Sequence, residues 1–210
     1  YPLNGNLKDT LGNDVPIILE GEPLWVNGIN SGFGKGLLLN GNSGLIIKLG
    51  YYDTLSLVFW IKGDAALSES NNPVLFDYGL NAISAQLDAT SGATALISVK
   101  DGSSASSVDA SIEYLNSFTK YSFFYFEAGS NYTKVYFKGY KTTGGSEIVY
   151  SEDLNFPGVI SANSEFLYIG RSSLRDDQKL TYFKGSIDEI HIYKRPLTNS
   201  EIETFAFTQT

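Results

Sequence analysis

Short apolar runs separated by turn residues constrain the fold of this chain more than any other feature. Glycine, asparagine and proline recur between the runs every ~8–12 residues, a spacing that is typical of an all-β sandwich. About a dozen runs have the length and the β-branched or aromatic content of strands, and only the C-terminus carries a convincing helix signal. No linker long enough to divide the chain is present, so we expect residues 1–210 to form a single domain.

The run TLSLVFWI, residues 54–61, is the strongest strand signal. Its apolar residues are continuous rather than alternating, which predicts a strand that is buried on both faces. Shorter runs at 37–39 and 44–49 flank the turn sequence NGN at 40–42, which favours a hairpin between them. The other predicted strands lie at 16–19, 25–28, 74–78, 82–87, 95–100, 111–114, 120–127, 133–138, 147–150, 166–169, 181–183 and 187–193.

The stretch GSIDEIHIYKRP, residues 185–196, predicts a strand that stops at a proline. Thr198 and Glu201 then stand at the capping-box spacing that begins a helix. Asp188 and Glu189 lie inside the strand, where charged residues are unusual. Because adjacent residues of a strand point to opposite faces, we do not expect these two carboxylates to form a catalytic pair.

Charge and composition exclude several classes of function. The formal net charge is −8 and the pI is about 4.6, which argues against nucleic-acid binding because phosphate contacts need clustered Lys and Arg. The chain has no cysteine, so it has no disulfide, no thiolate nucleophile and no cysteine-bound metal. With a single histidine and no Gly-x-Ser-x-Gly motif, it also lacks the parts of a serine or cysteine hydrolase.

Composition also bears on where the protein works. Eukaryotic extracellular domains of this size more often carry disulfides, so the lack of cysteine favours a bacterial cell-surface or periplasmic protein. The chain has no methionine, which leads us to expect a piece processed from a longer precursor. No apolar run approaches the ~20 residues of a membrane span, so no transmembrane segment is predicted.

Six segments, taken in order, resemble the pattern of laminin-G-like domains in the concanavalin A-like lectin/glucanase superfamily. The C-terminal part is the most similar and includes the family's final Leu-Ser/Thr-x-x-Glu-Ile helix. Tyr121 departs from the pattern because the family usually has Trp there, and Lys138 stands where Asp or Asn is common, so we assign no ligand role to Lys138. The segments are YPLNGNLKDTLGN (1–13), GKGLLLNG (34–41), TLSLVFWIKG (54–63), VYFKG (135–139), FLYIGR (166–171) and FKGSIDEIHIYKRPLTNSEI (183–202).

The resemblance implies an all-β jelly-roll sandwich of two antiparallel sheets with a short C-terminal helix. It also implies a non-catalytic binding module, and we expect that module to bind glycans at a bacterial cell surface. One alternative is a structural or protein–protein interaction domain of a larger surface protein. A divergent glycosidase is less favoured, because the Glu-x-Asp-x-x-Glu motif that sets acid and nucleophile ~5 Å apart in sandwich glycosidases is absent.

Aromatic rings that stack on the C–H faces of sugars are typical of glycan-binding grooves, and nearby polar side chains supply hydrogen bonds. For each ring the alternative is ordinary packing, and for the charged loop at 171–179 the alternative is a solvated turn. The candidate residues are Trp25, Tyr78, Tyr132, Tyr140 and Tyr182 as ring platforms, with Arg171 and Arg175 as polar contacts.

Asp188 is the candidate ligand for a structural Ca²⁺ ion. The resemblance implies this role, because in many β jelly rolls an Asp near the last long strand joins carbonyls of the N-terminal segment around calcium. The ion takes about six to eight oxygens, so further ligands are needed. The candidates are Asp9, Asn27, Gly28 and other backbone groups. The alternative is that Asp188 accepts hydrogen bonds from the amides of a neighbouring loop. The single histidine, His191, is expected to be a surface or half-buried structural residue.

Overall fold

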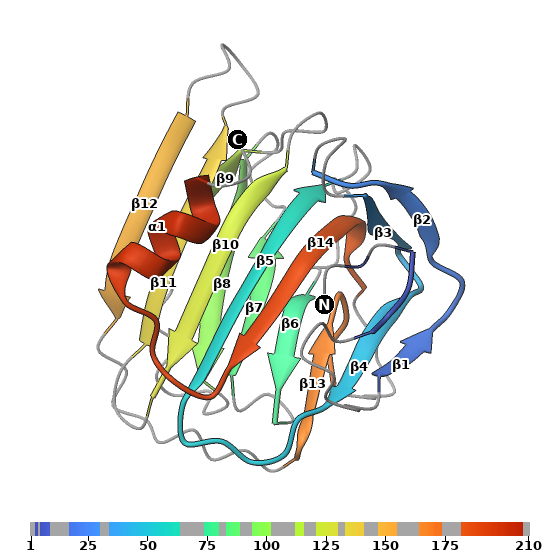
Figure 1. Ribbon diagram of the computed structural model, residues 1–210, viewed down its shortest axis with the longest axis horizontal. Coiled ribbons are helices and arrows are strands. Elements are labelled where there is room, and N and C mark those ends of the chain that lie inside the picture. The colour runs from blue at the N-terminus through green and yellow to red at the C-terminus, as the bar shows by residue number, and fades with distance from the viewer. Residues whose placement is uncertain are drawn as a thin grey trace.

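β5 (Leu55–Gly63) forms the centre of one of the two sheets in a computed structural model of the protein (Figure 1). It pairs antiparallel with β10 on one side and β14 on the other, and we call this layer the β5 sheet. Its seven strands, in spatial order, are β12 (Glu147–Leu154), β11 (Thr133–Tyr140), β10 (Ser122–Ala128), β5, β14 (Lys184–Tyr193), β3 (Lys35–Asn40) and β2 (Leu24–Asn27).

The second sheet, which we call the β13 sheet, lies behind the first in the view of Figure 1. All strand pairs in both sheets are antiparallel. With α1 (Asn199–Phe207) at the end of the chain, this confirms the predicted jelly-roll sandwich. The seven strands of the β13 sheet, in spatial order, are β1 (Ile17–Glu20), β4 (Gly44–Lys48), β13 (Phe166–Ile169), β6 (Val74–Tyr78), β7 (Ile83–Asp88), β8 (Thr94–Asp101) and β9 (Ile112–Leu115).

The description that follows concerns the part of the chain whose placement is defined. These residues are 3, 5–8, 17–29, 34–63, 74–79, 83–88, 94–101, 112–115, 121–129, 133–140, 147–154, 164–173 and 182–207.

Two predictions about strand connections were wrong. β3 and β4, on either side of the NGN turn, join different sheets and do not pair with each other. The turn is a corner instead, in which the Asn40 N–H donates to Ser43 Oγ at 3.1 Å. A hairpin signal reports only the local turn, whereas β4 takes its partners, β1 and β13, from the other sheet. The predicted strand at 181–183 is not present as a strand among its described residues, of which only Tyr182 forms a bridge, with Arg171.

The main core lies between the two sheets, and β5 contributes to it with alternate residues. Phe59 and Ile61 of β5 are fully buried there. Val58 and Trp60 point to the other side of the strand and are also buried, at 1% and 3% exposure, in a second apolar cluster. Burial on both faces confirms the prediction from the continuous run, because the outer face of this strand is covered as well.

The capping box predicted for the C-terminal helix is present. The Glu201 N–H donates to Thr198 Oγ1 at 3.2 Å, and the Thr198 N–H donates to Glu201 Oε2 at 2.8 Å. Arg195 adds a hydrogen bond to Glu201 Oε1 at 2.6 Å. These bonds satisfy amides that the first turn of a helix leaves without intrahelical partners, and so they fix where α1 begins.

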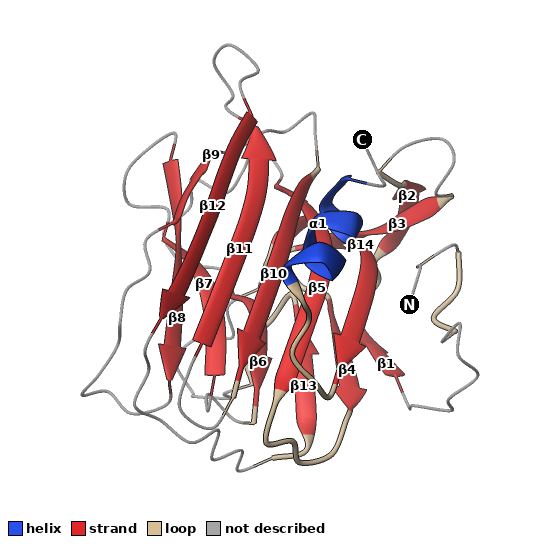
Figure 2. Cartoon of the chain, turned by 60° about the vertical axis from the view of Figure 1, so that its left-hand side comes forward, coloured by secondary structure: helices blue, strands red, loops and turns tan. Residues whose placement is uncertain are grey.

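α1 lies against the outer face of the β5 sheet, as Figures 1 and 2 show. Leu197 and Ile202 pack there in one cluster with Trp60 and Phe123. The buried carboxylate of Glu127 accepts the Leu197 N–H at 3.2 Å, which ties the start of this segment to β10. No helix within the described ranges is long and apolar enough to cross a membrane.

Candidate functional site

The outer face of the β13 sheet carries a row of apolar and aromatic side chains that runs across its strands. In β13 the alternate residues are fully buried in the core, so Phe166 and Tyr168 point outward and are half-buried. Tyr168 pairs with Ile46 of β4, which in turn pairs with Ile18 of β1. Ile18 is 56% exposed, so this face presents both rings and aliphatic groups to solvent.

Arg171 follows the end of β13 and lies beside two tyrosines. Its guanidinium carbon is 5.1 Å from the ring centroid of Tyr168 and 5.9 Å from that of Tyr182, within the range of cation–π attraction. The guanidinium also pairs with the Glu20 carboxylate on β1, and Nε donates to the Ser172 carbonyl at 2.9 Å. Arg171 is only 3% exposed, so this buried charge holds two half-buried rings in place.

Local backbone features make room for Arg171 and fix the chain after it. Gly170 has φ +75°, in the left-handed region that favours glycine. At Gly44, on the neighbouring strand, a Cβ would lie 2.9 Å from Cγ of Arg171, which is too close for an ordinary contact. Beyond the arginine, the Ser173 N–H and hydroxyl donate to Asp77 Oδ2 at 2.9 and 2.6 Å. Hydrogen bonds therefore anchor the segment on β6, and Arg171 packs closely against Gly44 of β4.

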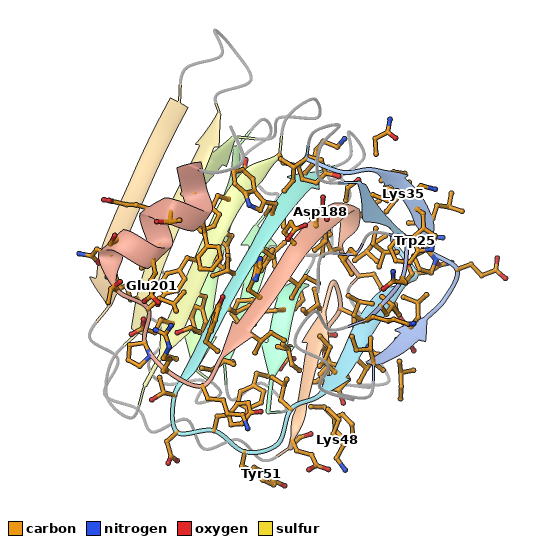
Figure 3. The ribbon with its side chains drawn as sticks, in the orientation of Figure 1. Trp25, Lys35, Lys48, Tyr51, Asp188 and Glu201 are labelled. Atoms are coloured by element: carbon orange, nitrogen blue, oxygen red, sulfur yellow. The ribbon has the colours of Figure 1, made fainter. Side chains whose placement is uncertain are left out.

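Two of the predicted sugar-contact rings pack into the protein instead. Tyr78 is fully buried, its hydroxyl donates to the Gly50 carbonyl at 2.7 Å, and burial raises the pKa of that hydroxyl. A ring that is closed to solvent offers no face to a sugar, so the structure contradicts Tyr78 as a platform. Trp25, on β2, is half-buried and packs against the main core (Figure 3), so ordinary packing is enough to explain the position of this ring.

The structure brings together two of the other candidates, Arg171 and Tyr182. Tyr132 and Arg175 lie outside the described residues. For Tyr140 only the backbone is described, at the end of β11 in the other sheet. The site that the structure describes therefore centres on Arg171.

Tyr168 and Glu20 were not predicted as parts of this site. Tyr168 could have been found from FLYIGR, because placing the leucine and isoleucine of that segment in the core turns the phenylalanine and tyrosine outward. Glu20 gives no such local signal. It lies 151 residues before Arg171 and reaches it because β1 and β13 both pair with β4.

Asp188 lies in β14, in the other layer, and fastens a loop to the β5 sheet (Figure 3). Its Oδ2 accepts the Ile29 N–H at 3.1 Å, and its Oδ1 accepts the Glu189 N–H at 2.9 Å. The carboxylate lies so close to Gly28 that a Cβ there would be 2.5 Å from Oδ2. Burial raises the pKa of Asp188 to about 7, although the two amides act in the opposite direction. Anchoring of a loop by hydrogen bonds is thus what the structure shows for this residue.

A β-bulge interrupts β14 between Asp188 and His191. Glu189 has φ +50°, a strained backbone region for a residue with a side chain, and its carboxylate lies 3.5 Å from His191 Nε2. Regular alternation is therefore interrupted at this bulge, and the expectation that Asp188 and Glu189 do not form a catalytic pair stays a prediction. Asp188 itself is fully buried, so its carboxylate is not open to a substrate. His191 is half-buried beside Phe205, as expected for a structural residue.

The described residues around Asp188 do not fit a calcium site by themselves. Both of its oxygens accept amides, and the nearby Asn27 carbonyl accepts the Tyr121 hydroxyl at 3.3 Å. Within the described ranges, no three carboxylate or histidine side chains come together as a metal-binding group. These groups supply fewer oxygen ligands than calcium takes, which is about six or more. Asp9 lies outside the described residues, so calcium binding stays a prediction.

Residues 42–203 match a laminin G-like family described as the concanavalin A-like lectin/glucanases superfamily. The matched region spans well over half of the 210 residues. The chain belongs to this family. The resemblance found in the six sequence segments is thereby confirmed. No curated protein sequence matches the chain significantly.

Solved structures with a similar fold include domain 4 of AbnA, an extracellular GH43 arabinanase from Geobacillus stearothermophilus, in complex with arabinotriose. The two chains are 21% identical, with a TM-score of 0.61, over 97% of this laminin G-like chain and 94% of domain 4. The binding domain of botulinum neurotoxin DC is similar as well. Its complexes with rat synaptotagmin II and with SialylT have TM-scores of 0.67 and 0.66, with 14% identity in each case. These matches cover 100% of this chain but only 50% of the toxin chain, so the laminin G-like chain spans about half of that binding domain.

Proposed function

We propose that this laminin G-like chain is a non-catalytic module that binds carbohydrate at a bacterial cell surface. The observation that carries the proposal is the pair of tyrosines, Tyr168 and Tyr182, beside the Arg171 guanidinium on the outer face of the β13 sheet. Related folds give support. One similar structure is a complex with arabinotriose, and another is reported with the statement that cell entry of botulinum neurotoxin type C depends on two ganglioside molecules.

The geometry suits a sugar ring. Tyr168 belongs to a strand and is restrained by Arg171 and by Phe166, whose ring centroid is 6.4 Å away, so it loses little freedom when a ligand binds. Its half-exposed ring can stack on the C–H face of a sugar. The Glu20 carboxylate, with a 30% exposed side chain, can accept hydrogen bonds from sugar hydroxyls. Arg171 positions both kinds of contact.

Replacement of Tyr168 by alanine tests the proposal directly. A glycan array first identifies a ligand, and calorimetry then compares the wild type with Tyr168→Ala. We expect affinity to fall about tenfold, because aromatic stacking contributes roughly 0.5–1.5 kcal/mol and 1.4 kcal/mol is a factor of ten. Tyr193→Ala is the matched control, because it removes the same side chain from the other sheet. An array without any bound glycan, or equal losses for the two variants, would refute the proposal.

A protein-contact role is the second candidate, because apolar side chains are exposed on two end strands. Ile18 and Leu19 on β1 are 56% and 37% exposed, and Leu24 on β2 is 60% exposed. The toxin binding domain in complex with synaptotagmin II has a protein partner in a related fold. Sedimentation velocity tests this role for self-association. A concentration-dependent dimer that Ile18→Ser abolishes would favour it, and a monomer at all concentrations would count against it.

The proposal of a module without catalysis is tested separately. A glycosidase needs two carboxyl groups ~5–9.5 Å apart that face the substrate, whereas the Asp188 carboxylate is fully buried. We expect no release of reducing sugar from any glycan that binds. Turnover that disappears in Glu189→Gln would overturn this expectation and favour a divergent glycosidase.

The location is part of the same proposal. AbnA is described as extracellular, and the family match is consistent with a secreted or surface protein. We propose that residues 1–210 form one domain of a bacterial surface or periplasmic protein. Limited proteolysis tests the domain boundary: one protected fragment is expected, and two stable fragments would argue for two domains.

A further inference from the structure

The described cations on the outer face of the β13 sheet are already paired with carboxylates. The Arg171 guanidinium pairs with Glu20, and its side chain is only 4% exposed. At the other end of β13, Lys48 Nζ lies 2.8 Å from Glu165 Oε1. The more open member of the Arg171 pair is the acid, since the Glu20 side chain is 30% exposed. A ligand that approaches the two tyrosines thus meets a carboxylate before it meets a guanidinium.

We propose that this face selects uncharged glycans and rejects glycans that carry sialic or uronic acid. The inference rests on the proposed function, because it assumes that the sugar binds at Tyr168 and Tyr182. Arginine is the side chain best suited to recognise a carboxylate, through paired N–H donors. Arg171 already donates to Glu20 and to the Ser172 carbonyl, so a sugar carboxylate competes with a partner that the fold supplies.

Glu20 distinguishes the two classes of sugar by its charge. A neutral sugar donates a hydroxyl to this carboxylate, which is a favourable charge-assisted hydrogen bond. A sugar carboxylate at the same place adds a like charge, and such juxtapositions disfavour binding. The net charge of −8 adds a long-range repulsion that salt screens. The same side chain therefore favours one ligand class and disfavours the other.

The test compares matched pairs of glycans on one array, followed by calorimetry. Galactotriose and trigalacturonic acid form one pair, which differs in carboxyl groups, and lactose and sialyllactose form another, which differs by one sialic acid residue. We expect the wild type to bind a neutral member at least about tenfold more tightly than its acidic counterpart. This comparison needs no variant, so it holds even if a substitution disturbs folding.

Glu20→Gln identifies the cause of the selectivity. The amide keeps the size of the side chain but removes its charge, so we expect the preference for the neutral member to shrink about tenfold, mainly through tighter binding of the acidic one. Glu201→Gln is the matched control. It also removes one negative charge and releases an arginine, Arg195, but it lies at the start of α1 on the other sheet, as Figure 3 shows, and should leave the preference unchanged.

The possible outcomes separate the inference from the proposed function. If acidic glycans bind as tightly as neutral ones and Tyr168→Ala weakens the binding of both, the proposed selectivity is wrong. The proposed binding site would then still be supported. A preference that survives in Glu20→Gln would also overturn the selectivity mechanism. Failure of every glycan to bind would overturn both proposals together.

Discussion

Both sheets direct aromatic side chains away from the main core, but the two outer faces are used differently. On the β5 sheet, Trp60, Phe123 and Tyr125 point outward, and none of them is more than 3% exposed, because α1 and the segment before it cover them. On the β13 sheet, Phe166 and Tyr168 also point outward and are half-buried, and the described part of the chain places no helix over them. An outward ring that other residues cover therefore contributes to the stability of the fold, whereas a ring left partly open stays available to a ligand.

The largest expected effect is a contrast in stability between the two faces. Phe123→Ala should lower the free energy of unfolding by about 3–5 kcal/mol, because it leaves a cavity under α1. Tyr168→Ala should lower it by only about 1 kcal/mol, because the ring is partly solvated and leaves no closed cavity. Urea denaturation of both variants at pH 7 provides the measurement. Equal losses would show that the β13 face is also part of a core.

A second expected effect concerns pH and the loop fixed to the β5 sheet. The pKa of Asp188 is about 7 in the folded protein and near 3.8 when unfolded. The folded state therefore holds this proton more tightly. The contribution of this group to stability is complete below about pH 4 and is lost as the pH rises to about 7.

Asp188→Asn removes this titration, and so the fall in the free energy of unfolding between pH 5 and pH 8 should become smaller. Urea denaturation at both pH values is the measurement. Asp53→Asn, at an exposed position, is the control and should leave the dependence unchanged. If Asp188→Asn retains the full dependence on pH, burial of this carboxyl group is not its cause.

A smaller effect is expected at Thr198, where α1, the helix that covers the outer face of the β5 sheet, begins. Thr198→Ala removes the hydroxyl that accepts the Glu201 N–H, and losses of this kind reduce stability by about 1 kcal/mol. Thr198→Ser keeps the hydroxyl and should behave like the wild type. Thermal melting of the two variants distinguishes them. Identical melting temperatures would show that α1 is held by its packing alone.

The capping box also predicts a response to acid. Hydrogen bonding from Arg195, and then from the Thr198 amide, lowers the pKa of Glu201 to about 2. Its contribution to stability is therefore present above about pH 4.5 and is lost as the pH falls toward 2. Glu201→Gln should reduce the loss of thermal stability between pH 5 and pH 3. An unchanged loss would assign it to other carboxyl groups.

The smallest expected effect concerns calcium. The described ligands near Asp188 do not complete a calcium site, so the predicted ion needs further ligands such as Asp9. If the site forms, calcium should raise the melting temperature slightly, EDTA should reverse the rise, and both Asp188→Asn and Asp9→Asn should abolish it. An unchanged melting temperature would refute the calcium prediction.

Predictions from the sequence were correct where the signal is local or strongly periodic. The continuous run at 54–61 predicted a strand buried on both faces, and the spacing of Thr198 and Glu201 predicted the start of α1. The hairpin prediction was wrong at the NGN turn, because β3 pairs with β2 and β14 and β4 pairs with β1 and β13, and a local turn signal does not choose between such partners. The bulge at Glu189 has no sequence signal that we recognise, since glycine or asparagine is the usual residue at positive φ.

The candidate site shows the same limit. Arg171 and Tyr182 could be named from one charged loop and its border. Their arrangement could not, because Glu20 comes from the opposite end of the chain and the exposure of Tyr168 depends on what covers the sheet. Tyr78 was misassigned because a tyrosine beside a turn gives the same sequence signal whether its ring is buried or exposed. Which side chains form the site thus depends on pairing between strands far apart in the sequence and on what covers the outer face of the sheet.

The position of β14 has a consequence for biosynthesis. This strand lies between β5 and β3, and Ile187 pairs with Leu37, a residue made 150 positions earlier. During synthesis, β2 and β3 cannot join their sheet until nearly the whole chain has been made. The rings under α1 stay uncovered for longer still, because α1 is made last. Long-range pairing of this kind slows folding and exposes apolar surface in the nascent chain. Truncations before residue 193 should therefore aggregate rather than fold.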